Sequence, residues 1–212
     1  GDVVSLINLG SYPCRPFRTP LLHTVGIVGA DGIMGTWFSR FFRDQGFHVI
    51  GFDPIQQQSS PNAASLKQLV EQSDAIVLSV PMHAMETLAQ ELATLVRPGQ
   101  LVVENCSIKS AALPALLKHI PPHAELLGVH TMFGGDTPQL RGQNVIVTRT
   151  PQSKEKSRYF EDLLYKHGAQ LTFATTERHD EMSAYLQSLV QAVALIFGKT
   201  LSESKVSVEE LE

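Results

Sequence analysis

The chain has 212 residues, which is enough for one sizeable core and too few for a large multidomain assembly. Its 17 basic and 21 acidic side chains give a net charge of -4, and hydrophobic residues make up 43%, the ordinary composition of a globular domain. No polybasic tail or stripe points to nucleic acid as a partner. Cys14 and Cys106 have neither CxxC spacing nor nearby histidines of metal-ligand type, so we expect no disulfide framework and no metal site.

Two features bear on the location of the protein. The longest apolar stretch, from Leu189 to Phe197, is interrupted by Gln191 and is far shorter than the roughly 20 residues of a membrane span. Residues 1–23 lack the basic start and long apolar segment of a signal peptide, so we interpret them as a lead-in segment. We therefore expect a cytoplasmic protein with no membrane partner.

From residue 24 onward, apolar runs alternate with amphipathic stretches. Thr24–Val28 is predicted as a strand, and the glycine cluster after it leads into a helix. The apolar side chains of that helix have helical spacing: Met34, Trp37, Phe38, Phe41 and Phe42. Gly46 ends the helix. The later predicted elements are strand 48–53, helix 64–72, strand 75–80, helix 84–96, strand 101–103, helix 111–119, strand 125–129, strand 145–148, helix 153–167 and strand 170–174.

This order of elements predicts an α/β fold. Continuous apolar strands separated by helices are typical of a doubly wound, parallel, Rossmann-type sheet that is covered on both faces. We assign it to residues 24–175. Residues 177 to about 204 are predicted to form one long helix with little polar face, and such a helix must be buried. Residues 176–212 are therefore expected to begin an all-helical dimerisation or substrate domain, covered by a second subunit or by helices beyond this sequence.

A glycine-rich segment, residues 29–35, lies between the first predicted strand and the first helix. At this position the N–H groups of a helix N-terminus favour phosphates, and glycines let the backbone approach a dinucleotide closely. Asp53 ends the second strand about 20 residues further on, where an acid accepts hydrogen bonds from the adenosine ribose and repels a 2'-phosphate. The sequence thus favours NAD over NADP, although Ala30 replaces the first glycine of the usual pattern and a tight turn without ligand remains the alternative.

Three further segments follow predicted strands: Ser79-Val80-Pro81-Met82-His83, Glu104-Asn105-Cys106-Ser107-Ile108-Lys109 and Gly128-Val129-His130-Thr131-Met132-Phe133-Gly134. Together with the glycine segment they resemble the prephenate dehydrogenase family, whose patterns SVP, D-x-x-S-V-K and HPMFG come in the same order. The resemblance covers roughly residues 24–212. All three segments lie at strand ends, where ligands of open α/β sheets bind. The expected cofactor-binding residues are Gly29, Ala30, Gly32, Ile33, Met34, Gly35, Asp53, Ser79, Val80 and Pro81.

The resemblance implies the NAD-dependent oxidative decarboxylation of prephenate to 4-hydroxyphenylpyruvate, a step in tyrosine biosynthesis. It implies that His130 is the catalytic residue that accepts the proton of the ring hydroxyl, and that Ser107 hydrogen-bonds the same hydroxyl. His179 and Gln191 join these two as expected substrate-binding residues. Considered alone, a histidine after an apolar strand is more often a loop or core residue, and Ser107 could serve as the N-cap of the next helix.

The sequence departs from the family pattern at several points. Thr131 and Gly135 replace prolines, which makes the loop after His130 less stiff. Gln191 stands where the family has a second substrate-binding histidine, and an amide can hydrogen-bond a carboxylate but carries no charge. The family's substrate-binding arginine lies in helices that would follow residue 212.

Three hypotheses follow from this combination of features. The first is a prephenate dehydrogenase domain whose remaining helices are trimmed or supplied by a partner chain, and this is the one we favour. The second is a dehydrogenase for arogenate or an amino analogue of prephenate. The third is a non-catalytic NAD-binding module with a regulatory role. In each case we expect a homodimer formed through residues 180–200.

Overall fold

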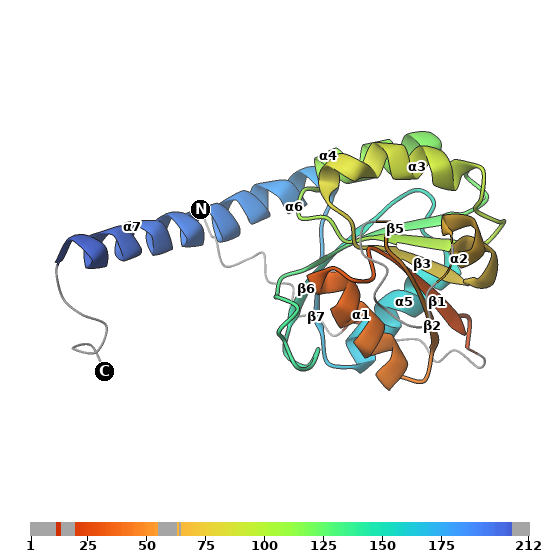
Figure 1. Cartoon of the computed structure of the whole chain (residues 1–212), viewed down its shortest axis with the longest axis horizontal. Coiled ribbons are helices and arrows are strands. Elements are labelled where there is room, and N and C mark those ends of the chain that lie inside the picture. Colours follow the sequence, from red (N-terminus) through yellow and green to blue (C-terminus); the bar gives the residue numbers. More distant parts are fainter. Residues whose placement is uncertain (1–11, 14–19, 55–62, 64, 205–212) are drawn as a thin grey trace.

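The computed structural model describes residues 12–13, 20–54, 63 and 65–204, and it contains a seven-stranded sheet with helices on both faces (Figure 1). The strand order is β2-β1-β3-β4-β5-β6-β7. The strands are β1 (Thr24–Val28), β2 (His48–Phe52), β3 (Ala75–Leu78), β4 (Leu101–Glu104), β5 (Glu125–Thr131), β6 (Asn144–Arg149) and β7 (Gln170–Phe173). The helices that cover the sheet are α1 (Ile33–Asp44), α2 (Leu66–Gln72), α3 (Met85–Ala93), preceded by the 3-10 turn η2 (Met82–Ala84), α4 (Lys109–His119) and α5 (Glu155–Lys166).

The predicted Rossmann-type fold is confirmed, with one difference in strand direction. Strands β1 to β5 are all parallel to their neighbours, as is the β6–β7 pair. The pair β5–β6 is antiparallel. The connection between these two strands, residues 132–143, contains no helix that could carry the chain back across the sheet, so β6 returns alongside β5 in the opposite direction.

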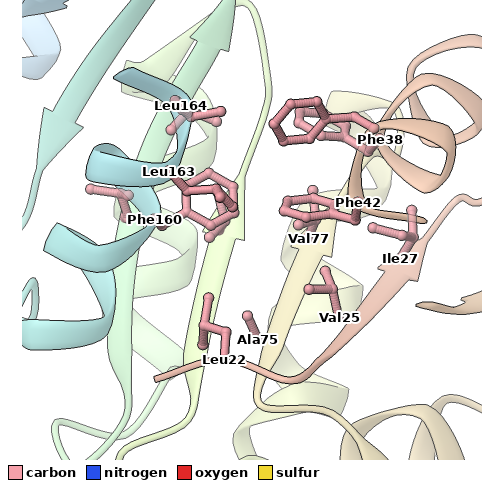
Figure 2. Packing of buried hydrophobic residues seen from close by; sticks show 14 of the residues in the cluster. Leu22, Val25, Ile27, Phe38, Phe42, Ala75, Val77, Phe160, Leu163 and Leu164 are labelled. Carbon is pink, nitrogen blue, oxygen red and sulfur yellow. The ribbon is translucent and has the colours of Figure 1, made fainter. Parts of the chain in front are cut away.

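Two apolar layers hold the helices to the sheet. Helices α1 and α5 pack on one face, and α2, α3 and α4 pack on the other (Figure 1). Figure 2 shows the first layer, in which Phe38 and Phe42 of α1 lie opposite Phe160 of α5 above the strands. The centroids of the Phe42 and Phe160 rings are 5.7 Å apart, and none of the three side chains is exposed. Burial of each ring contributes about 1.5–3 kcal/mol, so this layer fixes α1, and with it the glycine segment, against β1.

The C-terminal part of the described chain is one continuous helix that extends away from the sheet (Figure 1). It consists of α6 (Thr176–Ser183), a π-helical turn η3 (Ala184–Ser188) and α7 (Leu189–Ser204). The prediction of a single long helix is confirmed, and its burial by a second subunit or by further helices stays a prediction. No residue of α7 is buried, because the helix extends away from the sheet (Figure 1). By length and composition alone, residues 176–204 would also be able to cross a membrane.

Several expectations fall wholly or partly outside the described residues. Most of the lead-in segment, Cys14, the segment 56–61 and residues 205–212 lie there. The helix predicted from residue 64 begins at Leu66, where Ser65 caps it by accepting a hydrogen bond from the Gln68 N–H.

Candidate active site

The expected cofactor-binding residues meet at the carboxyl edge of the sheet, where the strand order reverses between β1 and β3. Gly29 has a positive φ of 79°, and its N–H donates to the Phe52 carbonyl oxygen at 2.8 Å. A Cβ atom on Gly29 would overlap the carbonyl oxygen of Ser79, and one on Gly35 would overlap that of Gly29. The Asp31 N–H lies 3.4 Å from the Asp53 carboxylate. These contacts leave no room for a side chain at Gly29 or Gly35. The N-terminus of α1 therefore lies at the point where the strand order reverses, which is where dinucleotides bind in such sheets.

A cavity of about 430 Å³ lies beside the N-terminus of α1. Its volume is within the range of small-molecule sites. Its lining comes from α1, the ends of β4 and β5, the loop after β5 and η3, and comprises Met34, Asn105, Ser107, His130, Thr131, Met132, Phe133, Gly134 and Gln187. The structure thus brings His130 and Ser107 together with Met34, which belongs to the expected cofactor-binding set. His179 and Gln191 do not line this cavity.

His130 lies near the end of β5 and is only 5% exposed. Its Nδ1 atom is 2.9 Å from Nε2 of His179, and its Nε2 atom is 3.3 Å from the side-chain nitrogen of Gln187. Burial, assisted by the positive charge of Lys109 and by the His179 ring, lowers the pKa of His130 to about 4, although the Asp180 carboxylate opposes the shift. His130 is therefore neutral near pH 7 and has one ring nitrogen available to accept a proton.

His179 lies behind His130 and does not face the cavity. Its side chain is fully buried, and its Nδ1 atom is 2.7 Å from Oδ1 of Asp180. Burial lowers the pKa of His179, although the hydrogen bond to Asp180 acts in the opposite direction. His179 does not line the cavity and is bonded to His130 on the side away from Asp180, so its direct contact with substrate stays a prediction that this geometry does not favour.

Ser107 is exposed and lines the cavity, but it does not cap the helix that follows it. Ile108 occupies the N-cap position of α4 and has no side-chain capping bond. The N–H groups of Lys109 and Ser110 donate instead to the two carboxylate oxygens of Asp180, at 2.8 and 2.9 Å. The capping alternative for Ser107 is therefore wrong, and its hydroxyl is not engaged in capping α4.

A buried ion pair, which the sequence analysis did not identify, lies beneath the cavity. Lys109 is fully buried, and its ammonium nitrogen is 2.5 Å from Glu104, 2.8 Å from the Cys106 carbonyl oxygen and 2.5 Å from the Val129 carbonyl oxygen. All three ammonium hydrogens therefore have acceptors. Burial raises the pKa of Glu104 above its usual value, although the nearby Lys109 ammonium group acts in the opposite direction. Burial and the nearby Glu104 carboxylate raise the pKa of Cys106 to about 12, so this side chain stays a thiol.

The two residues that replace family prolines make contacts of their own. The N–H and hydroxyl of Thr131 lie 3.2 and 3.3 Å from Oδ1 of Asn105. A proline at this position would have no N–H to donate. A Cβ atom on Gly135 would lie 2.5 Å from Cγ2 of Ile33, so a larger residue there would displace the loop from α1. The same loop accepts hydrogen bonds from Trp37 and Arg40 at the Thr137 carbonyl oxygen, which limits the flexibility expected from the loss of proline.

Gln191 is exposed on α7, and Gln187, one helical turn earlier, contacts His130 instead. Gln187 was not among the site residues predicted from the sequence. The signal was present in the one-turn spacing between the two glutamines, because residues four apart share a helix face. Among the described residues, no group of three or more histidine, cysteine, aspartate or glutamate side chains could hold a metal ion.

The fold and the cavity define the class of the protein: a Rossmann-type nucleotide-binding domain with a buried histidine beside the nucleotide edge. Residues 38–173 match the family model described as "Prephenate dehydrogenase, nucleotide-binding domain". The chain belongs to the prephenate dehydrogenase family.

Individual relatives agree with this assignment. The "T-protein" of Enterobacter agglomerans is 30% identical over 99% of this chain and 55% of its own length. The "Probable arogenate/prephenate dehydrogenase" of Methanocaldococcus jannaschii is 29% identical over 88% of this chain and 44% of its own length. The chain thus spans about half the length of these curated relatives. The crystal structure of prephenate dehydrogenase from A. aeolicus, in complex with hydroxyphenyl propionate and NAD+, has the same fold, with a TM-score of 0.71, 22% identity and coverage of 88% of this chain and 71% of that chain.

The buried ion pair generates a stability prediction. Replacing Lys109 by methionine leaves Glu104 buried without its cation, so we expect Lys109→Met to lower the free energy of unfolding by about 3–5 kcal/mol in urea denaturation. The double variant Glu104→Gln/Lys109→Met should recover most of this loss. Lys67→Met, which removes an exposed partner of Glu71, should cost less than about 1 kcal/mol. A loss for Lys109→Met as small as that for Lys67→Met would contradict the structure.

Proposed function

We propose that the chain carries out the NAD-dependent oxidative decarboxylation of prephenate to 4-hydroxyphenylpyruvate. The observation that carries this proposal is the buried, neutral His130, whose Nε2 atom lies at a cavity that also reaches Met34 at the N-terminus of α1. In this proposal residues 24–175 are the dinucleotide-binding domain, and the helix from residue 176 begins a second, helical domain. The family membership of the chain supports the same reaction class.

The residues at the carboxyl edge fit a dinucleotide. The close packing of Gly29 and Gly35 leaves room for a pyrophosphate beside the N-terminus of α1, where the helix dipole stabilises negative charge. Asp53 lies against this turn at the end of β2, in place to accept hydrogen bonds from a ribose. Ala30, Gly32, Ile33, Ser79, Val80 and Pro81 complete the proposed nucleotide-contacting set. When bound, NAD+ supplies the acceptor for the hydride that the substrate ring loses.

His130 and Ser107 carry the proposed chemistry on the substrate side. His130 Nε2 accepts the proton of the ring hydroxyl while the carbon that bears this hydroxyl loses hydride. The carboxylate bonded to the ring then leaves as carbon dioxide, its bonding electron pair completes the aromatic ring, and the proton returns to the ring oxygen. Ser107, which lines the same cavity, hydrogen-bonds the same oxygen. The two side chains position the reacting atoms.

A second substrate is favoured by one observation in the site. The amide in contact with His130, Gln187, is neutral, and so is Gln191 at the position of the family's second histidine. Neutral amides suit a substrate with less negative charge, such as arogenate or another amino analogue of prephenate. The M. jannaschii relative is named for both arogenate and prephenate. Parallel assays with the two acids separate these substrates, and binding of NAD+ without oxidation of either would support the non-catalytic alternative.

The role of His130 predicts a selective loss of activity. We expect His130→Asn to lower prephenate-dependent NADH formation by on the order of 10²- to 10⁴-fold, because the proton acceptor is removed. The Kd for NAD+ should change less than about twofold, since the ring accepts no nucleotide hydrogen bond in this proposal. His123→Asn, whose ring lies 3.3 Å from the Val96 carbonyl oxygen and away from the cavity, should behave as wild type. Retained activity in His130→Asn would contradict the assigned role.

The lowered pKa of His130 adds a pH dependence with a defined sign. The neutral form accepts the proton, and it predominates above the folded-state pKa of about 4. The acid limb of kcat/KM should therefore lie near pH 4 and not near the value of about 6.5 for an unperturbed histidine. The wild-type acid limb should be absent from the residual activity of His130→Asn.

We also propose that the chain is a cytoplasmic homodimer formed through residues 180–200. Support comes from the apolar side chains of α7, which are more than half exposed in the isolated chain: Leu189, Val190, Val193, Leu195, Ile196 and Phe197. A contiguous exposed apolar surface of this kind is typical of an interface. Burying it against a second copy would remove much of this apolar surface from water.

Light scattering tests the dimer directly. We expect the wild-type chain to have twice the 23.3 kDa mass of one chain. Val193→Glu should shift it to the monomer, because a buried unpaired carboxylate is costly. Ser202→Glu, near the end of the same helix, should leave the dimer intact. A monomeric wild-type chain, or sedimentation of the wild-type chain with phosphatidylcholine vesicles, would refute the proposed interface.

A further inference from the structure

Three side chains form a continuous row that ends at the cavity. Oδ1 of Asp180 lies 2.7 Å from Nδ1 of His179, and Nε2 of His179 lies 2.9 Å from Nδ1 of His130. His130 Nε2 then faces Gln187 and the cavity. Asp180 and His179 belong to α6, whereas His130 belongs to β5, so the row connects the start of the C-terminal helix with the sheet.

The direction of each hydrogen bond follows from the chemistry of the groups. Burial alone would raise the pKa of Asp180, but hydrogen bonds from Ser110, His179 and the backbone hold it at about 2, so the carboxylate is ionised and can only accept. His179 must therefore donate from Nδ1. A neutral imidazole has one N–H, so Nε2 of His179 accepts, and His130 must donate from Nδ1. The only lone pair left on the His130 ring is on Nε2, at the cavity.

We propose that Asp180 and His179 are positioning residues that hold His130 as the Nδ1–H tautomer, so that its Nε2 atom carries the lone pair that accepts a proton from the substrate. The catalytic role of Asp180 and His179 rests on the function proposed above. The order of the protons along the row does not depend on that function. Asp180 and His179 act only through His130. The fully buried ring of His179 fits this role, because it cannot reach the cavity itself.

The place of Asp180 is fixed by a second set of bonds. Its two oxygens also accept the N–H groups of Lys109 and Ser110 at the N-terminus of α4, where a negative charge is favourable. The same carboxylate therefore fixes the start of α4, which follows Ser107 in the chain, and the orientation of the His130 ring. The loop that carries Ser107 and the strand that carries His130 are coupled through one side chain of α6.

The charged groups around His130 keep the resting ring neutral. Lys109, itself paired with Glu104, is close enough to the ring to disfavour a second positive charge. Asp180 acts in the opposite direction through His179, so it stabilises the ring once His130 has accepted a proton. An amide in place of Asp180 can face Nδ1 of His179 with its oxygen or with its nitrogen, so it no longer fixes the order of the row. Where the nitrogen faces His179, every bond reverses, and His130 presents an N–H to the cavity and accepts no proton.

Nitrogen NMR of ¹⁵N-histidine-labelled protein tests the proton order without substrate or cofactor. In the wild-type chain near pH 7 we expect the Nδ1–H tautomer for both His130 and His179, with signals assigned from His130→Asn and His179→Asn. Asp180→Asn should make the Nε2–H tautomer of His130 detectable, because the amide can accept from or donate to His179. Glu86→Gln alters another carboxylate in contact with a histidine, His119 at 2.7 Å, and should change the His119 signal alone. An Nε2–H tautomer of His130 in the wild-type chain, or no change in Asp180→Asn, would overturn the proposal.

Turnover supplies the second measurement. We expect Asp180→Asn to lower kcat by on the order of 10²- to 10⁴-fold with the KM for NAD+ nearly unchanged, and Asp180→Glu, which keeps the carboxylate, to recover part of the loss. A loss confined to KM would overturn the positioning role. If Asp180→Asn does not fold because α4 loses its cap, the wild-type spectrum still decides the proton order. If the chain oxidises neither acid, the proposed function fails while the NMR result still tests the row.

Discussion

One buried ammonium group holds the ends of two neighbouring strands in place. Lys109 Nζ contacts the Glu104 carboxylate at the end of β4, the Cys106 carbonyl oxygen in the following loop and the Val129 carbonyl oxygen of β5. Its three hydrogens have three acceptors in a region without solvent access, where an unpaired charge would be costly. Ser107 follows Cys106 in the chain, and His130 follows Val129. The contacts of Lys109 therefore fix the positions of both cavity-lining residues.

Above this ion pair, parallel strands bring residues that are far apart in sequence to one edge. β1 supplies the glycine turn, β2 leads to Asp53, and β5 carries His130. The apolar layer of Phe38, Phe42 and Phe160 is on the face of the sheet that also holds α1, so the nucleotide side and the histidine side share one rigid scaffold. Asp180 then connects this scaffold to α6, and the row from Asp180 to His130 aims one nitrogen at the cavity.

Much of this arrangement was predictable from local patterns, and the rest depended on partners remote in sequence. Apolar runs located all seven strands, including β7, which has no fully buried residue, and the glycine turn with Asp53 located the nucleotide edge. The direction of β6 depended on the absence of a crossover helix after residue 131. The position of His179 behind His130, and the burial of Lys109, depended on contacts across β4, β5 and α6 that no local pattern encodes. The apolar sequence of α7 indicates that the helix is covered, but it does not show which chain covers it. The exposure of α7 in the isolated chain could therefore not be predicted.

The central claim is that His130 Nε2 is the atom that receives the substrate proton beside a bound nicotinamide. A crystal structure of the chain with NAD+ and 4-hydroxyphenylpyruvate tests it most directly. The account predicts the phenolic oxygen at about 2.6–3.2 Å from His130 Nε2, with the nicotinamide ring on the Met34 side of the same cavity. A dinucleotide bound elsewhere, or a phenolic oxygen held by other groups with the His130 ring turned into the interior, would contradict it.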